Sequence, residues 1–273
     1  MIHFLNRSSG SIKAMDKPGF TDYYHDIFQQ RWQQLSTALL SKPQYYELKR
    51  GLLQPYYLDK ASYIAALQLP LAGKRSILDM CSAPGGKALV LASGMEAEAQ
   101  LTCNERSSER RRRLASVLES HLPPETLKRT KVTGHDASKW GLYEQDAYDA
   151  ILLDVPCSSE RHIISSPSHT EKWSPARSKH LAIQAYAMLA SAFMAVQPGG
   201  YILYSTCALL DRENDQVVTK LLRRKPNQCR VLSVEADCGE TTEHGIQILP
   251  DRCSGMGPIY FSLLQRNAEA SLP

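Results

Sequence analysis

The sequence has no long hydrophobic run, no internal repeat and no low-complexity segment. No stretch is long enough and apolar enough to cross a bilayer, and residues 1–20 lack the apolar core of a signal peptide. We therefore expect a soluble, intracellular protein that is not secreted and has no membrane partner.

Cysteines in metal-binding or structural patterns are also absent. The seven cysteines are an odd number, and none stands in a Cys-x-x-Cys pair or in a His/Cys cluster at zinc spacing. We therefore expect no bound metal, and we interpret the cysteines as free thiols in a reducing compartment.

Length and composition are those of an ordinary globular protein. The chain has 273 residues, of which 43% are hydrophobic and 22% charged. This length suits one large α/β domain with a small extension. The formal net charge of +4 is compatible with an anionic partner but does not require one.

One short apolar run ends in residues that carry chemistry. Ile151 to Leu153 has the pattern of a strand buried on both faces, and Pro156 ends its pairing. Asp154 and Cys157 therefore lie at the carboxyl end of a central strand, where open α/β sheets bind ligands. A lone cysteine after a strand is more often a small buried residue than a catalyst, so this run alone does not identify a nucleophile.

A strand, a glycine-containing loop and a helix follow one another from residue 76. Residues 76–80 form the strand, residues 81–87 (CSAPGGK) the loop, and Ala88 begins the helix. This order is typical of the first unit of a doubly wound sheet, in which the loop backbone approaches a ligand closely. The loop matches neither Gly-x-Gly-x-x-Gly nor a phosphate-binding loop.

Two acids follow the next two expected strands. Glu105 follows residues 100–104 at the distance, about 20 residues past the glycine loop, that suits binding of a ribose diol. A solvated loop acid is an equal alternative. Asp136 follows residues 131–133 and could accept hydrogen bonds from an adenine amine.

The N-terminal 70 residues are expected to form a helical extension, with residues 71–273 as the main domain. The apolar spacing predicts one helix over residues 20–40 and a short one over 59–69. Residues 45–58 are rich in tyrosine, either as a helix packed on the core or as an aromatic and basic surface for nucleic acid. Arg106 and Arg110 to Arg113 form either a solvated helix face or a phosphate contact.

The second half continues the alternation of strands and helices. Residues 158–169 are polar and are interpreted as a substrate-facing loop. A long helix begins at Ser174-Pro175, and a strand over residues 201–204 ends at Ser205-Thr206-Cys207. Three late segments (231–234, 246–249 and 258–264) suggest antiparallel strands at the edge of the sheet.

Three motifs together resemble one enzyme family. Residues 81–87, Asp154-x-Pro156-Cys157 and Ser205-Thr206-Cys207 occur in the order found in the NOP2/Sun (RsmB-like) RNA cytosine-5 methyltransferases. The resemblance covers about residues 20–265 and is greatest to the short, mitochondrial-type enzymes for small-subunit ribosomal RNA. It implies a Rossmann-like class I methyltransferase, with a mostly parallel seven-stranded sheet, an antiparallel edge strand and an N-terminal helical extension that faces RNA. It also implies the cytoplasm or the mitochondrial matrix as the location.

The resemblance further implies S-adenosylmethionine as cofactor and a role for each motif. Cys207 would be the nucleophile and Cys157 the group for product release. Asp154 would act as base or charge stabiliser between cofactor and cytosine, beside Lys87. The implied cofactor-binding residues are Cys81, Ser82, Ala83, Pro84, Gly85, Gly86 and Lys87 at the methionine end, Glu105 at the ribose, Asp136 at the adenine, and also Arg110 and Asp154.

Two thiols suit this chemistry. A thiolate that adds to carbon 6 of cytosine makes carbon 5 nucleophilic, and a second group then assists release of the product. The base must be unstacked, so looped or single-stranded RNA is the expected substrate. Ser82 stands where many relatives have alanine, and Glu105 where aspartate is usual. RNA docking is expected through residues 1–70, the arginine helix, a helper protein or the ribosomal subunit.

Four alternatives to a ribosomal RNA methyltransferase remain open. Transfer RNA is the main alternative substrate. A DNA cytosine methyltransferase would attack through Cys157, but its Glu-Asn-Val segment is missing. A non-catalytic assembly factor would not need both cysteines, and a small-molecule methyltransferase would not need Cys207.

Overall fold

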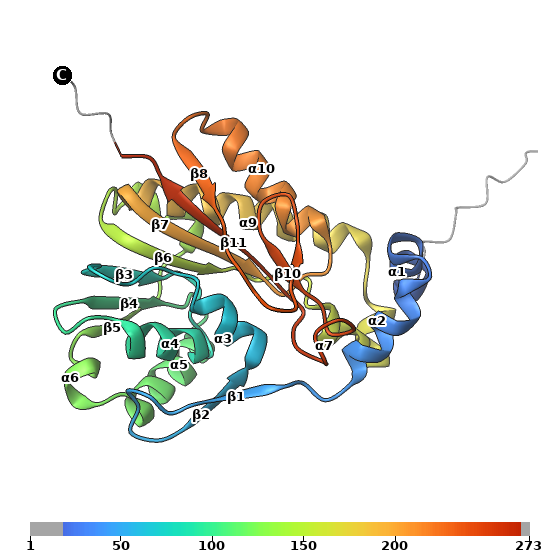
Figure 1. Cartoon of the computed structure of the whole chain (residues 1–273), viewed down its shortest axis with the longest axis horizontal. Helices are drawn as coiled ribbons and strands as arrows, with labels where there is room; N and C mark the ends of the chain where they lie inside the picture. The colour runs from blue at the N-terminus through green and yellow to red at the C-terminus, as the bar shows by residue number, and fades with distance from the viewer. Residues whose placement is uncertain (1–18, 269–273) are drawn as a thin grey trace, which may run out of the picture.

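A computed structural model describes residues 19–268, and one large sheet is its centre (Figure 1). Five parallel strands stand in the order β5-β4-β3-β6-β7. Their bounds are β3 Ser76–Asp79, β4 Gln100–Asn104, β5 Thr130–Thr133, β6 Tyr148–Asp154 and β7 Val196–Thr206. From β3 the chain first adds β4 and β5 on one side and then returns to add β6 and β7 on the other. Doubly wound folds have this reversal of strand order and bind ligands at the carboxyl ends of their strands. The expected Rossmann-like fold is confirmed.

Antiparallel strands complete the sheet beyond β7. β11 (Ile259–Arg266) pairs with β7, and its other edge holds both β10 (Ile246–Ile248) and β8 (Cys229–Leu232). β9 (Glu240–Thr241) pairs with β10. The described part of the chain thus has nine strands in this sheet, and the expected number of seven is wrong. The count is higher because β11 is long enough to pair with two strands along the same edge. Its residues 259–261 pair with β10, and its residues 263–266 pair with β8.

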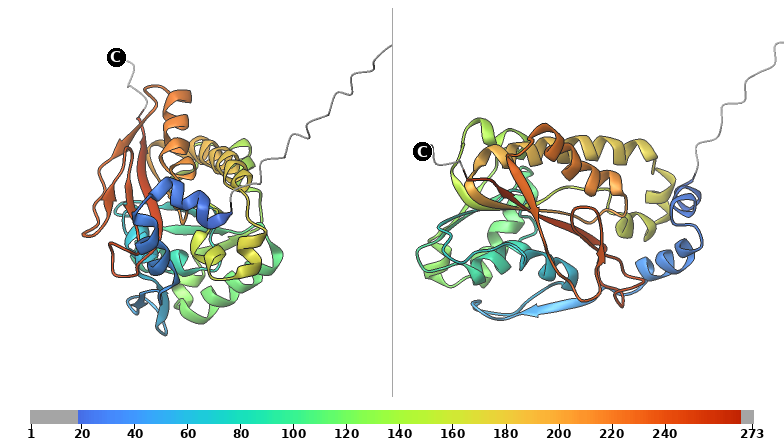
Figure 2. Two further views of the ribbon diagram at one scale, coloured as in Figure 1. Left: turned by 90° about the vertical axis from the view of Figure 1, so that its right-hand side faces the viewer. Right: turned by 45° about the horizontal axis from the view of Figure 1, so that its top comes forward.

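Helices cover both faces of the sheet (Figures 1 and 2). Because side chains alternate along a strand, Ile77 and Leu152 pack in one apolar cluster, whereas Leu78 and Ile151 pack in the other. The first cluster includes residues of α3 (Lys60–Ala66), α4 (Gly86–Gly94) and α5 (Ser108–His121). The second includes residues of α9 (Pro175–Ala195) and α10 (Asp215–Arg224). The sheet core is therefore buried on both sides, as the apolar run before Asp154 predicts.

The N-terminal segment differs from the expected helices in two places. Residues 20–40 form two helices, α1 (Phe20–Phe28) and α2 (Arg31–Leu40), because the backbone of Gln29 leaves the helical conformation, with φ 53° and ψ −133°. β1 (Tyr45–Leu48) and β2 (Tyr56–Asp59) pair as an antiparallel hairpin, so a helix over 45–58 is wrong. Tyrosine favours strands, and the short segments find partners in each other.

The polar segment 158–169 is folded rather than a loop. It contains α7 (Glu160–Ile164) and α8 (Pro167–Glu171), and α1 and α2 pack near α7 at one end of the molecule (Figure 1). Ile163 joins an apolar cluster with side chains of α1, of α2 and of the segment after Cys207. This small core explains why a segment with few apolar residues is ordered here.

The remaining connections are short. They contain α6 (Pro124–Leu127) and two 3-10 helices, η1 (Ala137–Leu142) and η2 (Asp211–Glu213). Within residues 19–268, no helix has both the length and the apolar character that a membrane span requires.

Candidate active site

The carboxyl ends of the parallel strands meet at one cavity of about 540 Å³. Glu105 follows β4, Asp136 follows β5 and Asp154 ends β6, and all three line this cavity. Cys81, Ala83, Arg110, Cys157 and Cys207 line it as well. The structure thus brings together residues that lie up to 126 positions apart in the sequence. Ligand binding at this edge is what parallel α/β sheets favour.

A smaller cavity of about 250 Å³ adjoins this one and shares Cys81, Ala83 and Asp154 with it. The smaller cavity is lined by Cys81, Ser82, Ala83, Pro84, Gly86 and Lys87, with Ser62 and Asp154. Gly85 lines neither cavity. It has φ +118°, and an added Cβ would lie 3.0 Å from Cγ1 of Val117. Glycine at position 85 is therefore explained by the backbone, because it allows the tight turn that begins α4.

Asp79 also lines the smaller cavity, although the sequence does not mark it as a candidate. It ends β3 and is only 1% exposed. Neither of its carboxylate oxygens has a hydrogen-bond partner among the described residues, and the nearby Ser82 hydroxyl donates to the Asp79 main-chain oxygen instead (2.9 Å). Burial, and then the charge of Asp154, raises the pKa of Asp79 to about 7. A buried carboxylate of this kind suits a cationic ligand group.

The two acids that follow β4 and β5 are held by their own loops. Glu105 accepts a hydrogen bond from the Ser107 amide (2.8 Å) and faces Arg110 Nη1 at 3.3 Å. Arg110 also donates to the Ala83 carbonyl (2.7 Å), so it ties the glycine loop to Glu105. Asp136 accepts hydrogen bonds from the amide and hydroxyl of Ser138, and the hydroxyl bond is the main cause that lowers the pKa of Asp136.

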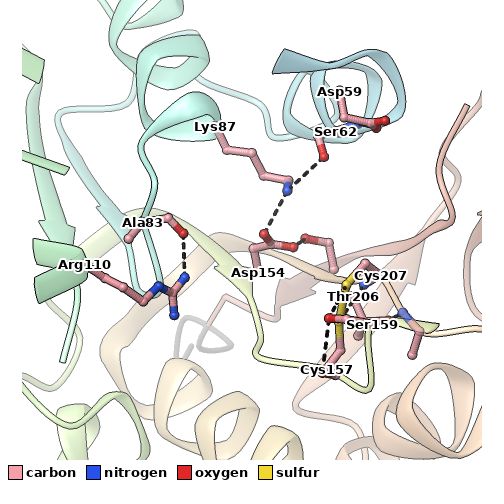
Figure 3. A network of polar contacts seen from close by, with 12 residues as sticks. Asp59, Ser62, Ala83, Lys87, Arg110, Asp154, Cys157, Ser159, Thr206 and Cys207 are labelled. Atoms are coloured by element: carbon pink, nitrogen blue, oxygen red, sulfur yellow. Dashed lines mark hydrogen bonds and ion pairs between the residues drawn. A yellow bond between two sulfur atoms is a disulfide. The ribbon is translucent and has the colours of Figure 1, made fainter. Parts of the chain in front are cut away.

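Asp154 is the centre of a polar network (Figure 3). Its Oδ2 accepts from Lys87 Nζ at 2.8 Å, and its Oδ1 accepts from Ser205 Oγ at 2.8 Å. Lys87 also contacts Ser62 Oγ at 3.2 Å. The sequence marks Ser205 only as a member of the Ser205-Thr206-Cys207 motif and assigns it no contact with Asp154. It does not mark Ser62 as a site residue, because a serine at the start of a helix has no distinguishing pattern. The network fixes the carboxylate from two sides.

The two cysteines that follow β6 and β7 are joined by a disulfide, with their Cα atoms 6.1 Å apart (Figure 3). A second disulfide joins Cys238 and Cys253, so the expectation of seven free thiols is wrong for these four residues. The physical reason is proximity: β6 and β7 are adjacent parallel strands, which brings Cys157 and Cys207 together. Cys81 is a free cysteine. Burial, followed by the charges of Asp79 and Asp154, raises the pKa of its thiol, which disfavours the nucleophilic thiolate.

Ser159 lies against both sulfur atoms. Its Oγ is 3.2 Å from Cys207 Sγ and 3.6 Å from Cys157 Sγ. Its backbone is left-handed, with φ 56°. Such a conformation costs a non-glycine residue free energy and recurs at functional sites, where the surrounding structure holds it. No feature of the sequence predicts this conformation, because the backbone conformation of a serine is set by its surroundings.

Comparisons with known proteins agree with this geometry. Residues 66–265 match the model of the family described as 16S rRNA methyltransferase RsmB/F. The bovine (Bos taurus) 5-cytosine rRNA methyltransferase NSUN4 is 31% identical over 233 residues, which are 79% of this chain and 60% of that protein. The mitochondrial tRNA (cytosine(34)-C(5))-methyltransferase of Danio rerio is 32% identical over 229 residues, 79% of this chain and 62% of that protein.

A solved structure shows the same fold. A methyltransferase homologue from Pyrococcus horikoshii superposes with a TM-score of 0.70 at 17% identity, over 90% of this chain and 93% of the other. The chain spans about three fifths of the length of the two curated relatives above. Because the family model covers most of the chain, the resemblance stated from the motifs is confirmed: this chain belongs to the RsmB/F (NOP2/Sun) family of S-adenosylmethionine-dependent RNA cytosine-5 methyltransferases.

Proposed function

We propose that the protein methylates carbon 5 of cytosine in ribosomal RNA, with S-adenosylmethionine as methyl donor. The observation that carries this proposal is the pair of cysteines at the ends of β6 and β7, beside Asp154 and at one cavity. A methyltransferase for oxygen or nitrogen atoms needs no cysteine nucleophile, whereas carbon 5 of cytosine becomes nucleophilic when a thiolate adds to carbon 6.

The residues present fit the proposed cofactor. The buried Asp79 carboxylate has no hydrogen-bond partner within residues 19–268, and the α-ammonium of S-adenosylmethionine would supply one. Glu105 would bind the ribose hydroxyls and Asp136 the adenine amine, since both carboxylates line the 540 Å³ cavity. Residues 81–87 and Arg110 would enclose the methionine end. When bound, the cofactor supplies an electrophilic methyl group.

Cys207 is proposed as the nucleophile. Once the disulfide has been reduced, the Cys207 thiolate forms a bond to carbon 6 of cytosine, and the ring electrons become available at carbon 5. A proton passed from the Lys87 ammonium through the Asp154 carboxyl group to the ring nitrogen would neutralise the negative charge that develops there. Ser205 would keep the carboxylate oriented for this contact.

Cys157 is proposed as the release group. After methylation, the proton on carbon 5 must be removed and the bond between Cys207 and carbon 6 must break, which restores the aromatic ring. Cys157 lies directly beside Cys207, so its thiolate is well placed to accept that proton. Without it, the covalent protein–RNA adduct would persist.

Ribosomal RNA is preferred as substrate because the family model is described as a 16S rRNA methyltransferase and bovine NSUN4 as an rRNA enzyme. Transfer RNA is the second candidate, since the Danio rerio relative is named for tRNA at similar identity. We further propose residues 1–70 as an RNA-facing subdomain and residues 71–273 as the catalytic domain. The exposed Tyr45 and Tyr57 of the hairpin and the exposed Arg112 and Arg113 of α5 offer stacking and phosphate contacts. A helper protein or the ribosomal subunit would present the RNA.

Methyl transfer from labelled S-adenosylmethionine tests this proposal. Reduced protein is incubated separately with small-subunit ribosomal RNA, transfer RNA and single-stranded DNA, and the products are mapped by bisulfite sequencing. We expect 5-methylcytosine in ribosomal RNA. Methylation of transfer RNA alone would favour the second candidate, and methylation of none of the three would contradict the proposed activity.

A further inference from the structure

A buried polar cluster contacts the segments that follow the two cysteines. We call Tyr24, Ser158, Glu160, Ser178 and Glu213 the glutamate cluster. Each of these side chains belongs to a residue that is at most 1% exposed. The proposed methyl transfer uses none of them. Burying two carboxylates costs desolvation free energy, so their burial at this place needs an explanation.

Glu160 joins three separate segments of the chain. Its Oε1 accepts hydrogen bonds from the Tyr24 hydroxyl (2.6 Å) and from the Ser158 hydroxyl. Its Oε2 accepts from the main-chain amide of Leu209 at 3.2 Å. Ser158 directly follows Cys157, and Leu209 is the second residue after Cys207. One carboxylate therefore ties the segment after each cysteine to the other, and ties both to helix α1.

Glu213 holds the same region from a second side. Its Oε2 accepts from the main-chain amide of Ser158 at 2.9 Å, and its Oε1 accepts from the Ser178 hydroxyl of α9 at 2.6 Å. Ser158 is thus held by Glu160 through its side chain and by Glu213 through its backbone. The segment after Cys157 is fixed to the long helix α9 independently of α1.

Apolar packing reinforces the contact with the N-terminal helix. Tyr24, Leu209 and Ile163 belong to one apolar cluster, and Tyr24 lies 5.2 Å from Trp32 between ring centroids. Tyr24 precedes the region that matches the family model, which begins at residue 66. The N-terminal helix therefore reaches the cysteine segments through a buried hydrogen bond, not only through surface contact.

We propose that Glu160 is a positioning residue that holds Cys157 and Cys207 side by side, and that helix α1 sets it through the Tyr24 hydroxyl. The effect of this positioning on catalysis rests on the proposed function. The positioning of the two sulfur atoms is independent of the proposed function, and it can be measured without any RNA substrate.

The thiol–disulfide equilibrium of the pair is that measurement. In a glutathione buffer, the two cysteine thiols and one oxidised glutathione give the disulfide and two reduced glutathione molecules. The equilibrium constant reports how closely the folded protein holds the two sulfur atoms. The Cys238–Cys253 disulfide in the same chain serves as internal reference.

Three variants of the full chain separate the role of the hydrogen bonds from that of the charge. Glu160→Ala removes all three bonds, and we expect the constant for Cys157–Cys207 to fall about tenfold. Glu160→Gln should stay within about threefold of the wild-type constant, because its amide oxygen can accept from Leu209 and its amide group can donate to the two hydroxyls. Tyr24→Phe loses one hydroxyl, and we expect a fall of about threefold. The constant for Cys238–Cys253 should not change in any of them.

The outcomes distinguish this proposal from the proposed function. A wild-type constant in Glu160→Ala overturns the positioning role, even if methyl transfer falls. If Glu160→Ala does not fold, Tyr24→Phe decides, and a wild-type constant there overturns the coupling to α1. A lowered constant in a protein that methylates no RNA supports the positioning role while the proposed function fails. Where methylation occurs, the single-turnover rate should fall with the constant, and the affinity for S-adenosylmethionine should not.

Discussion

The Lys87 ammonium lies 2.8 Å from the Asp154 carboxylate, and this ion pair connects the glycine loop to the strand that precedes Cys157. Both partners are largely shielded, with side-chain exposures of 14% and 30%. The second oxygen of Asp154 accepts from Ser205. The carboxylate thus has a fixed orientation at the cavity.

Removing the Ser205 hydroxyl should slow chemistry without weakening cofactor binding. Ser205→Ala leaves one oxygen of Asp154 without its buried donor, and we expect the single-turnover rate of methyl transfer to fall about tenfold. The control is Ser262→Ala on the neighbouring strand β11, a buried serine whose hydroxyl donates to the main-chain oxygen of His244. An equal effect of the two variants would indicate general destabilisation rather than orientation of Asp154.

Neutralising Asp79 should weaken cofactor binding. Asp79→Asn removes the charge that would pair with the α-ammonium of S-adenosylmethionine, so calorimetry should show affinity lower by about tenfold or more. A cofactor analogue without the amino group should bind both proteins equally. Asp149→Asn, at the opposite end of β6, provides the control, since Asp149 accepts from the amides of Arg75 and Ser76. Unchanged affinity in Asp79→Asn would contradict the assigned contact.

The same carboxyl group should make the stability of the cofactor-free protein depend on pH. The pKa of Asp79 is raised to about 7 in the folded protein, above the ordinary value of about 4. As pH rises from 4 to 7, the unfolded chain releases this proton first, so the free energy of unfolding should fall, by on the order of 3 kcal/mol. Chemical denaturation of wild type and Asp79→Asn across this range measures the difference. Equal slopes in the two proteins would contradict the raised pKa.

Oxidation should inactivate the enzyme reversibly. With Cys157 and Cys207 joined, neither sulfur can act as a thiolate, so we expect methyl transfer only after treatment with a dithiol reductant. The double variant Cys238→Ala/Cys253→Ala should keep the same dependence on reductant, because that disulfide lies outside the cavity at the strand ends. Activity of fully oxidised wild type would show that the nucleophile is another residue.

The positions of the strand-end residues could be predicted from the sequence because each follows a short segment with the pattern of a strand. Glu105, Asp136, Asp154 and Cys207 depend only on local strand patterns and on the rule that parallel strands end at one edge. Asp79, by contrast, looks like the last residue of a strand, and its missing hydrogen-bond partners become visible only when the fold encloses it.

The residues that the sequence did not reveal have partners far along the chain. Glu160 lies in a segment that reads as a polar loop, yet its carboxylate meets Tyr24, which is 136 positions away. The tyrosines of residues 45–59 fit a helix as well as a strand, and only the pairing of β1 with β2 decides between the two. The two disulfides likewise follow from tertiary proximity rather than from spacing.

Trapping of the covalent adduct tests the central assignment most directly. Reduced wild type, Cys157→Ala and Cys207→Ala are each incubated with ribosomal RNA and S-adenosylmethionine and then run on a denaturing gel. If Cys207 attacks and Cys157 assists release, Cys157→Ala accumulates a protein–RNA adduct and Cys207→Ala forms none and transfers no methyl group. An adduct in Cys207→Ala and none in Cys157→Ala would contradict the assignment of the two roles.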